Sequence, residues 1–145
     1  MNVLLAIDNS RSSQEATRVV AKQFRAKGMQ VRVLHVVEPI SAYISADMIP
    51  HFVPHIAKVE QEPRKDAKEL VQRAARQVRK VGFRTSEIVL EGDAKTGILD
   101  HAADWQADLI VVGSHGWKGL GPVLDGKCIG TCDPSCWLFR RGHPI

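Results

Sequence analysis

Three glycines follow an apolar run late in the chain, at a spacing that suits phosphate binding. Gly113, Gly116 and Gly126 give the pattern G-x2-G-x9-G directly after the four apolar residues 109–112. Glycine lets a backbone come close to a phosphate, and the N-terminus of a following helix adds a favourable dipole. The apolar run itself is typical of a buried parallel strand. The strand and the glycines together predict a nucleotide-binding α/β domain.

The cysteines and the paired histidines do not form a persuasive metal site. Cys128, Cys132 and Cys136 have the spacing C-x3-C-x3-C, without the second pair or the histidines that a zinc site usually has. His51 and His55 are four residues apart, but the proline between them argues against a regular helix. We therefore interpret these two as loop histidines and expect no metal ligands.

No set of residues has the pattern of a known catalytic machinery. The sequence contains no Gly-x-Ser-x-Gly elbow, no eight-residue Walker pattern and no G-x-G-x-x-G after its first strand. Ser10 is expected to cap a helix and not to act as a nucleophile. His35 lies inside a predicted strand and is interpreted as a core or ladder-adjacent residue and not as a catalyst. His115 lies in the glycine loop, where phosphate contact and a solvent-facing role are equally open.

Strands and helices are expected to alternate along the chain. Apolar runs predict strands at 3–7, 31–37, 85–90 and 109–112, and helical spacing predicts helices around 16–24, 67–78 and 98–105. Gly28 and Gly82 are expected to end the first two helices. Residues 39–54 contain three prolines and predict an irregular loop. Pro63 is expected in the first turns of the second helix, or as a kink in it.

This order predicts a parallel sheet with helices on both faces, since crossovers between parallel strands are right-handed. Ligands of such sheets bind beside the carboxyl ends of the strands. Asp8, Val36–Val37 and Gly113 all lie at expected carboxyl ends, so they can converge on one crevice. Asp8 also fits a plain turn and cap residue, a role that needs no ligand.

Length and charge exclude several classes of protein. A chain of 145 residues fits one domain, and its net charge of +4 is only mildly basic. The basic residues gather between 64 and 84 among acidic ones, without interleaved aromatics, which favours a solvated helix face over nucleic-acid binding. The first eight residues predict a strand and not a signal peptide. No apolar run is long enough to span a bilayer, so we expect a cytoplasmic protein without membrane contact.

Four segments together resemble the universal stress protein family. They are Val-Leu-Leu-Ala-Ile-Asp-Asn-Ser (3–10), Leu-His-Val-Val (34–37), Glu-Gly-Asp (91–93) and Ala-Asp-Leu-Ile-Val-Val-Gly-Ser-His-Gly (107–116). The resemblance covers residues 1–126. It implies a three-layer α/β sandwich with a five-stranded parallel sheet, a homodimer formed through the last strand, and binding of ATP or a related adenine nucleotide, with Mg²⁺.

The resemblance also implies positions for the nucleotide. Asp8 would hold the ribose side, Val36 would flank the adenine and Gly113 would approach the ribose, while Gly116 and Gly126 would shape the phosphate loop. The full set of implied contact residues is Ala6, Ile7, Asp8, Val36, Val37, Gly113, Ser114, His115, Gly116, Gly126 and Lys127. Lys127 departs from the family pattern, which has a serine or threonine hydroxyl there. A lysine could still meet phosphate as a point charge.

The tail, residues 127–145, does not continue the family pattern. It has no helical periodicity, it contains all three cysteines, and Pro134 interrupts it. Permitted codons for this tail, read one base later, encode Ser-Val-Ser-Glu-Pro-Val-Thr-Arg-His-Ala-Gly-Cys-Ser-Val-Glu-Val-Ile-Arg, which resembles the family's final helix and strand. We hypothesise a single-base insertion, or a sequencing error of that kind, near codon 126. The chain then divides into a domain at 1–126 and an aberrant tail at 127–145. We expect the last helix and strand to be lost and the strand at 109–112 to become an exposed edge.

Three functions are compatible with this sequence. The first is a sensor or regulatory module of stress response that binds ATP, with at most slow hydrolysis, because no general base is evident. The second is a dimeric interaction module of the same fold that binds no nucleotide. The third, a small α/β hydrolase or adenylating enzyme, lacks a nucleophile and motifs. A hydroxyl at position 127 would favour the first function, and the lysine weakens it.

Overall fold

Strands and helices alternate through the first 113 residues, as the apolar spacing predicts. The computed structural model describes residues 1–39, 49–113, 128–133 and 136–140. Its elements are β1 (Asn2–Ala6), α1 (Arg11–Gln23), β2 (Gln30–Val37), α2 (Ile49–Lys80), β3 (Arg84–Glu91), α3 (Ala94–Asp104), β4 (Leu109–Gly113), β5 (Cys128–Asp133) and β6 (Cys136–Arg140). The four predicted strands and three predicted helices are all present.

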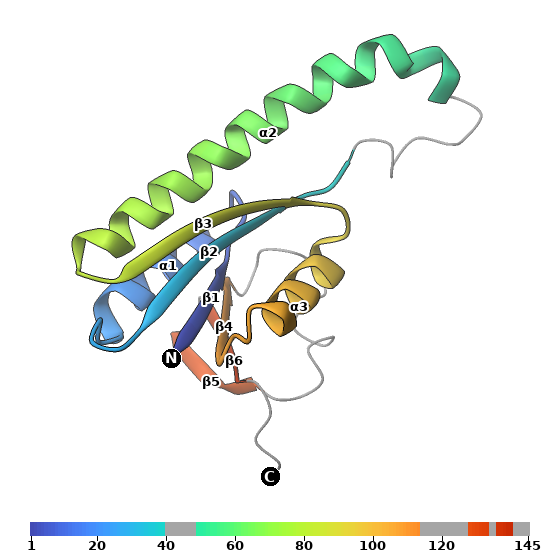
Figure 1. The fold of residues 1–145 in the computed structure, drawn as a ribbon. Helices are drawn as coiled ribbons and strands as arrows, with labels where there is room; N and C mark the ends of the chain where they lie inside the picture. The colour runs from blue at the N-terminus through green and yellow to red at the C-terminus, as the bar shows by residue number, and fades with distance from the viewer. Residues whose placement is uncertain (40–48, 114–127, 134–135, 141–145) are drawn as a thin grey trace.

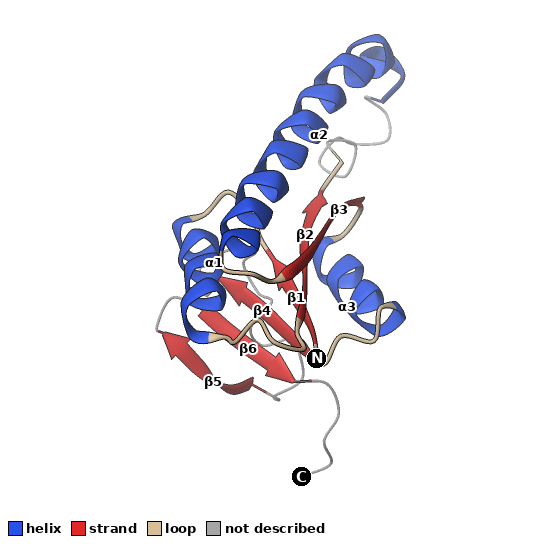
Figure 2. Cartoon of the chain, turned by 60° about the vertical axis from the view of Figure 1, so that its left-hand side comes forward, coloured by secondary structure: helices blue, strands red, loops and turns tan. Residues whose placement is uncertain are grey.

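The strands form one sheet in the order β3-β2-β1-β4-β6-β5 (Figure 1). The four strands from β3 to β4 are parallel, and Ala6 of β1 is level with Leu34 of β2 and Val112 of β4. Helices α1 and α2 lie on one face of the sheet and α3 on the other (Figure 2). This arrangement confirms the predicted three-layer α/β architecture with a parallel sheet.

Alternating residues of each central strand enter two separate cores, because successive side chains of a strand point to opposite faces. Val3, Leu5 and Ile7 pack with α1 and α2, whereas Leu4 and Ala6 pack with α3. All five are buried. The continuous apolar run of β1 is therefore explained by helices on both sides of it.

Helix α1 begins where a serine supplies the missing hydrogen-bond acceptor. Ser10 is its N-cap, and the Ser10 Oγ accepts a hydrogen bond of 3.2 Å from the Ser13 amide. The helix buries Ala16, Val19 and Val20 against the sheet. The expected capping role of Ser10 is confirmed.

Helix α2 starts earlier than the sequence predicted. It begins at Ile49, so residues 49–54 are helical and His51 and His55 lie in the helix and not in a loop. Pro63 consequently lies in the middle of α2 and not in its first turns. Proline costs a helix one backbone donor, but packing of Val71, Ala74, Ala75 and Val78 on the sheet outweighs this local preference.

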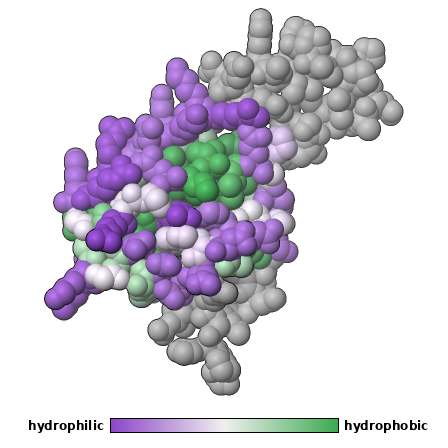
Figure 3. Space-filling model, in the orientation of Figure 1, coloured by the Kyte–Doolittle hydropathy of each residue, from purple (hydrophilic) through white to green (hydrophobic). Residues whose placement is uncertain are grey.

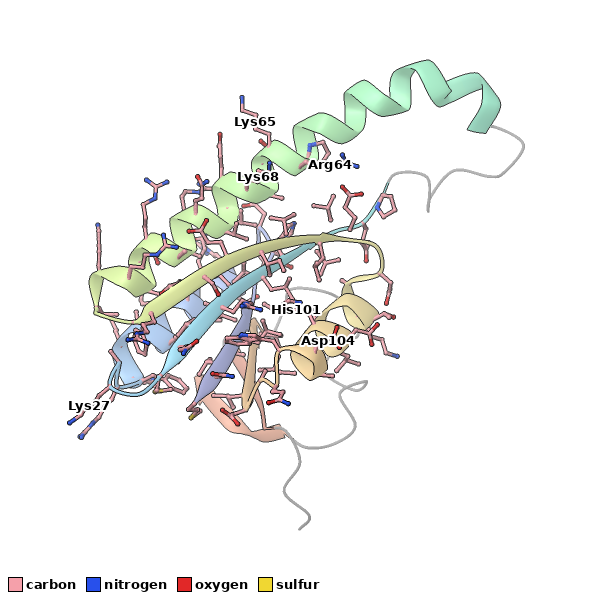
Figure 4. All side chains as sticks on the ribbon, in the orientation of Figure 1. Lys27, Arg64, Lys65, Lys68, His101 and Asp104 are labelled. Carbon is pink, nitrogen blue, oxygen red and sulfur yellow. The ribbon has the colours of Figure 1, made fainter. Side chains whose placement is uncertain are left out.

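The outer side of α2 is hydrophilic (Figure 3), and Arg64, Lys65 and Lys68 extend from the helix (Figure 4). Arg64 forms an ion pair with Glu91 of β3. Arg79 binds Glu87 of the same strand at 2.7 Å, and it donates to the Thr85 carbonyl. These two arginines connect α2 to β3, the outermost parallel strand, in addition to the apolar contacts of the helix.

The prediction that β4 forms an exposed edge of the sheet is wrong. Strand β6 lies antiparallel against β4, from Gly113 opposite Cys136 to Leu109 opposite Arg140, and β5 pairs with β6. An open strand edge presents unpaired amides and carbonyls that pair with any extended segment within reach. The tail therefore does contribute strands, but an antiparallel pair replaces the final parallel strand of the family pattern. The division of the chain at residue 126 stays a prediction.

Candidate functional site

The carboxyl ends of β1, β2 and β4 lie together at one edge of the sheet. Because Ala6 is level with both Leu34 and Val112, Asp8 follows at the level of Val36, and Gly113 lies beside Ile7. The structure thus brings together six of the predicted site residues, Ala6, Ile7, Asp8, Val36, Val37 and Gly113. They come from three segments, of which the first and the last are more than a hundred residues apart in sequence.

Asp8 organises the turn that leads into α1. Its Oδ1 accepts hydrogen bonds from the Ser10 amide at 3.0 Å, from the Ser13 hydroxyl at 2.7 Å and from the Ser10 hydroxyl. The Asp8 amide in turn donates to the Ser13 Oγ at 3.0 Å. The carboxylate is half-buried, and its Oδ1 fixes the entry of the helix. The turn and cap role considered for Asp8 is therefore present in the structure.

The residues before Asp8 offer little side-chain surface. Ala6 and Ile7 are both buried. The Ile7 amide donates to the Leu34 carbonyl at 2.9 Å, and the Ile7 carbonyl lies 2.7 Å from the His35 Nδ1. The imidazole thereby links β2 to the end of β1, which confirms the structural interpretation of His35.

Val36 and Val37 differ in their accessibility. Val36 is 2% exposed and belongs to the core under α3, where Gly97 leaves room for its methyl groups. Val37 is half-buried, and its carbonyl accepts a hydrogen bond of 3.0 Å from Gly92. A group that approaches this edge therefore meets Val37 and Asp8 before it meets Val36.

Gly113 has a packing role that the sequence did not reveal. A Cβ at this position would lie 2.6 Å from the Ser13 amide nitrogen and 2.7 Å from the Ser12 carbonyl carbon. The first turn of α1 thus lies directly against the end of β4, and only glycine permits that approach. Neither Ser12 nor Ser13 was predicted as part of the site, and no spacing in the sequence indicates this contact.

The remaining predicted site residues lie outside the described residues. They are Ser114, His115, Gly116, Gly126 and Lys127. The phosphate-binding part of the predicted site therefore rests on the sequence pattern.

Within the described parts of the chain, no group of three or more histidine, cysteine, aspartate or glutamate side chains could hold a metal ion. The helices of those parts also include none with the length and apolarity that crossing a membrane requires.

Comparison with known proteins gives this edge of the sheet its context. The model of the universal stress protein family matches residues 1–130. The chain belongs to this family. Universal stress protein A homolog 1 of Coxiella burnetii is 32% identical over 145 aligned positions, which cover 94% of this chain and 96% of that protein. The expected family membership is confirmed.

Two solved structures show the same fold. Universal stress protein UspA of Lactobacillus plantarum aligns with a TM-score of 0.67 at 22% identity, covering 82% of this chain and 80% of that one. The universal stress protein of Archaeoglobus fulgidus in complex with dAMP aligns with a TM-score of 0.58 at 25% identity, covering 79% and 81%. The second protein was solved with an adenine nucleotide.

Proposed function

We propose that this universal stress protein binds ATP or a related adenine nucleotide and acts as a sensor or regulatory module in a stress response. The observation that carries the proposal is the dAMP complex of the Archaeoglobus fulgidus relative, which has the same fold. The convergence of Asp8, Val37 and Gly113 at one sheet edge supports it, because ligands of parallel α/β sheets bind there. A cytoplasmic location belongs to the same proposal.

In this proposal, each part of the nucleotide meets a different segment. Val36 and Val37 flank the adenine, and Asp8 and Gly113 lie on the ribose side. Gly116 and Gly126 shape the phosphate loop with Ser114 and His115. Lys127 supplies a positive charge to the phosphates in place of the family's hydroxyl. Mg²⁺ would accompany ATP and neutralise part of the phosphate charge.

The first experiment is calorimetric titration of the full chain with ATP and with AMP in the presence of Mg²⁺. We expect saturable binding of both. For Lys127→Ala we expect ATP to bind about tenfold more weakly while AMP changes little, because one charge-assisted phosphate contact is lost. Lys65→Ala, on the outer side of α2, is the matched control. If neither nucleotide binds, the proposal is wrong. If the variant weakens both nucleotides equally, lysine does not contact the outer phosphates.

A second candidate is an interaction module of the same fold that binds no nucleotide. It is favoured by the roles that Asp8 and Gly113 already have inside the chain, as helix organiser and as close-packed glycine. Native mass spectrometry of the purified protein separates the two candidates. A bound adenine-nucleotide mass supports the first, and a bare dimer supports the second.

A further inference from the structure

A cavity lies between α1 and α2, beside the nucleotide edge proposed above, with which it shares Ile7 and Asp8. Its volume is about 220 Å³, and it is open to solvent. It is lined by residues of both helices and of the turn at Asp8 and Asn9, but not by Val36, Val37 or Gly113. Apart from Ile7 and Asp8, its lining residues are not part of the proposed nucleotide site.

The lining of this cavity carries two arginines against one carboxylate, that of Asp8, and this balance of charge favours an anion. Helix α1 contributes Gln14 and Arg18, and α2 contributes Arg73 and Gln77. In each helix the two residues are four apart, so they lie on the same face. Two guanidinium groups and two amides therefore surround the opening. Arginine recognises carboxylates and phosphates through two parallel hydrogen bonds, and it keeps its charge at all physiological pH values.

Arg73 is set apart from the other arginines of α2. Arg64 pairs with Glu91, Arg76 donates to the Gln72 carbonyl, and Arg79 binds Glu87. Among the described residues, Arg73 makes no hydrogen bond or ion pair, and it is the one that lines the cavity.

Across the opening, Arg18 pairs with Glu15 at 2.7 Å in a solvent-exposed ion pair. Exposed pairs of this kind stabilise a protein by only about 0–1 kcal/mol, so Arg18 can exchange Glu15 for a bound anion.

The floor of the cavity and its size limit the ligand further. Ile7, Leu70 and Ala74 give it an apolar base. Pockets for drug-sized molecules have volumes of roughly 300–1,000 Å³, so this one suits something smaller. We propose that the α1–α2 cavity is a second binding site, for a small organic anion whose carboxylate or phosphate groups bind Arg18 and Arg73 and whose carbon skeleton rests on the apolar floor. The site does not depend on nucleotide binding.

The test is an NMR titration of the ¹⁵N-labelled full chain with citrate and, separately, with inorganic phosphate. We expect saturable shifts of the Gln14, Thr17, Arg73 and Gln77 amides with at least one of these probes. For Arg73→Gln we expect binding to weaken about tenfold, because a charge-assisted contact is lost. Arg76→Gln, which removes the same charge from the same helix outside the cavity, should leave the affinity unchanged. Gln14→Leu should weaken binding without any change in charge.

Three results would overturn this site. One is the absence of shifts at about 10 mM of either probe, a concentration that corresponds to very weak binding. Another is equal weakening by Arg73→Gln and Arg76→Gln, which would indicate unspecific attraction to a basic helix. The third is displacement of the probe by AMP, which would make the cavity part of the nucleotide site. Because the titration is read without nucleotide, its failure is distinct from failure of the proposed function.

Discussion

At the scale of single residues, the turn between β1 and α1 joins two strands and a helix. The Asp8 carboxylate organises Ser10 and Ser13, and Ser13 in turn lies against Gly113 at the end of β4. Asp8 and Gly113, which were both predicted as site residues, are thus connected through Ser13, which was not. A ligand at this edge would meet a turn whose geometry is already fixed by the protein.

The close approach at Gly113 leads to a stability prediction. Gly113→Ala places a methyl group 2.6 Å from a backbone nitrogen, which cannot rotate away, so α1 must move. We expect a loss of about 1–3 kcal/mol in the free energy of unfolding, as is usual for overpacking. Urea denaturation would measure it.

Gly97→Ala provides the control for that measurement. Its Cβ would lie 3.3 Å from a methyl carbon of Val36, a contact that a shift of a few tenths of an ångström relieves, and alanine favours the helix. We expect it to change stability far less than Gly113→Ala. Equal losses for the two variants would contradict the packing role of Gly113.

A polar cluster under α3 makes stability depend on pH. The Arg32 guanidinium lies 4.4 Å from the centre of the Trp105 ring, donates to the Ser86 hydroxyl at 3.0 Å and lies 3.3 Å from the His101 Nε2. Because arginine only donates, the His101 Nε2 must accept, and the imidazole must be neutral. Burial, and then the positive charge of Arg32, lower the pKa of His101 below its usual value, against the opposing charge of Asp104.

The sign of the pH effect follows from this lowered pKa. The unfolded chain takes up the His101 proton more readily than the folded one, so the stabilisation is complete above pH about 6.5 and is lost as the pH falls toward the folded pKa. We expect the free energy of unfolding, measured in urea from pH 8 to pH 5, to fall more steeply for the wild type than for His101→Gln. Glutamine can accept the same hydrogen bond without titrating. Identical slopes would show that His101 does not titrate against Arg32.

At the scale of elements, pairing at the sheet edge and helix packing both overrode local sequence signals. Prolines predicted a loop where α2 is helical, and the irregular tail predicted no strand where β6 completes the edge of β4. The open edge of β4 supplied hydrogen-bonding partners for β6, and the apolar residues of α2 between 71 and 78 pack on the sheet. The family resemblance implies a dimer formed through the final strand. In this chain the antiparallel strand β6 lies next to β4. The edge of the sheet therefore differs from the dimer surface that the resemblance implies.

At the scale of the whole molecule, the tail decides how this chain relates to its family. The family model matches residues 1–130, which leaves the last fifteen residues outside the match. We propose that this difference comes from a one-base shift near codon 126. The shift would have replaced the hydroxyl of the family pattern at position 127 by the present lysine.

The gene sequence and a pair of proteins test that proposal. We expect the codons of residues 127–145, read one base later, to encode the string that begins Ser-Val-Ser-Glu-Pro. A protein carrying that string after Gly126 is expected to form a dimer and to bind ATP more tightly than the chain with its present tail. Native mass spectrometry would report both properties. Codons that cannot encode the string would exclude the shift. If the restored tail changes neither dimerisation nor ATP binding, the shift has no effect on function.

Except for the start of α2, the sequence by itself determined the elements of residues 1–113, their alternation and hence the parallel sheet, because the period of apolar residues is a local property. It also determined that Asp8, Val36, Val37 and Gly113 stand at one edge, since all parallel strands end on the same side. Only the tertiary structure decided that Asp8 holds Ser10 and Ser13, that Gly113 admits the start of α1, that Arg73 faces a cavity, and that β6 pairs with β4. These features depend on contacts between segments distant in sequence, and no local pattern encodes which atoms will meet across them.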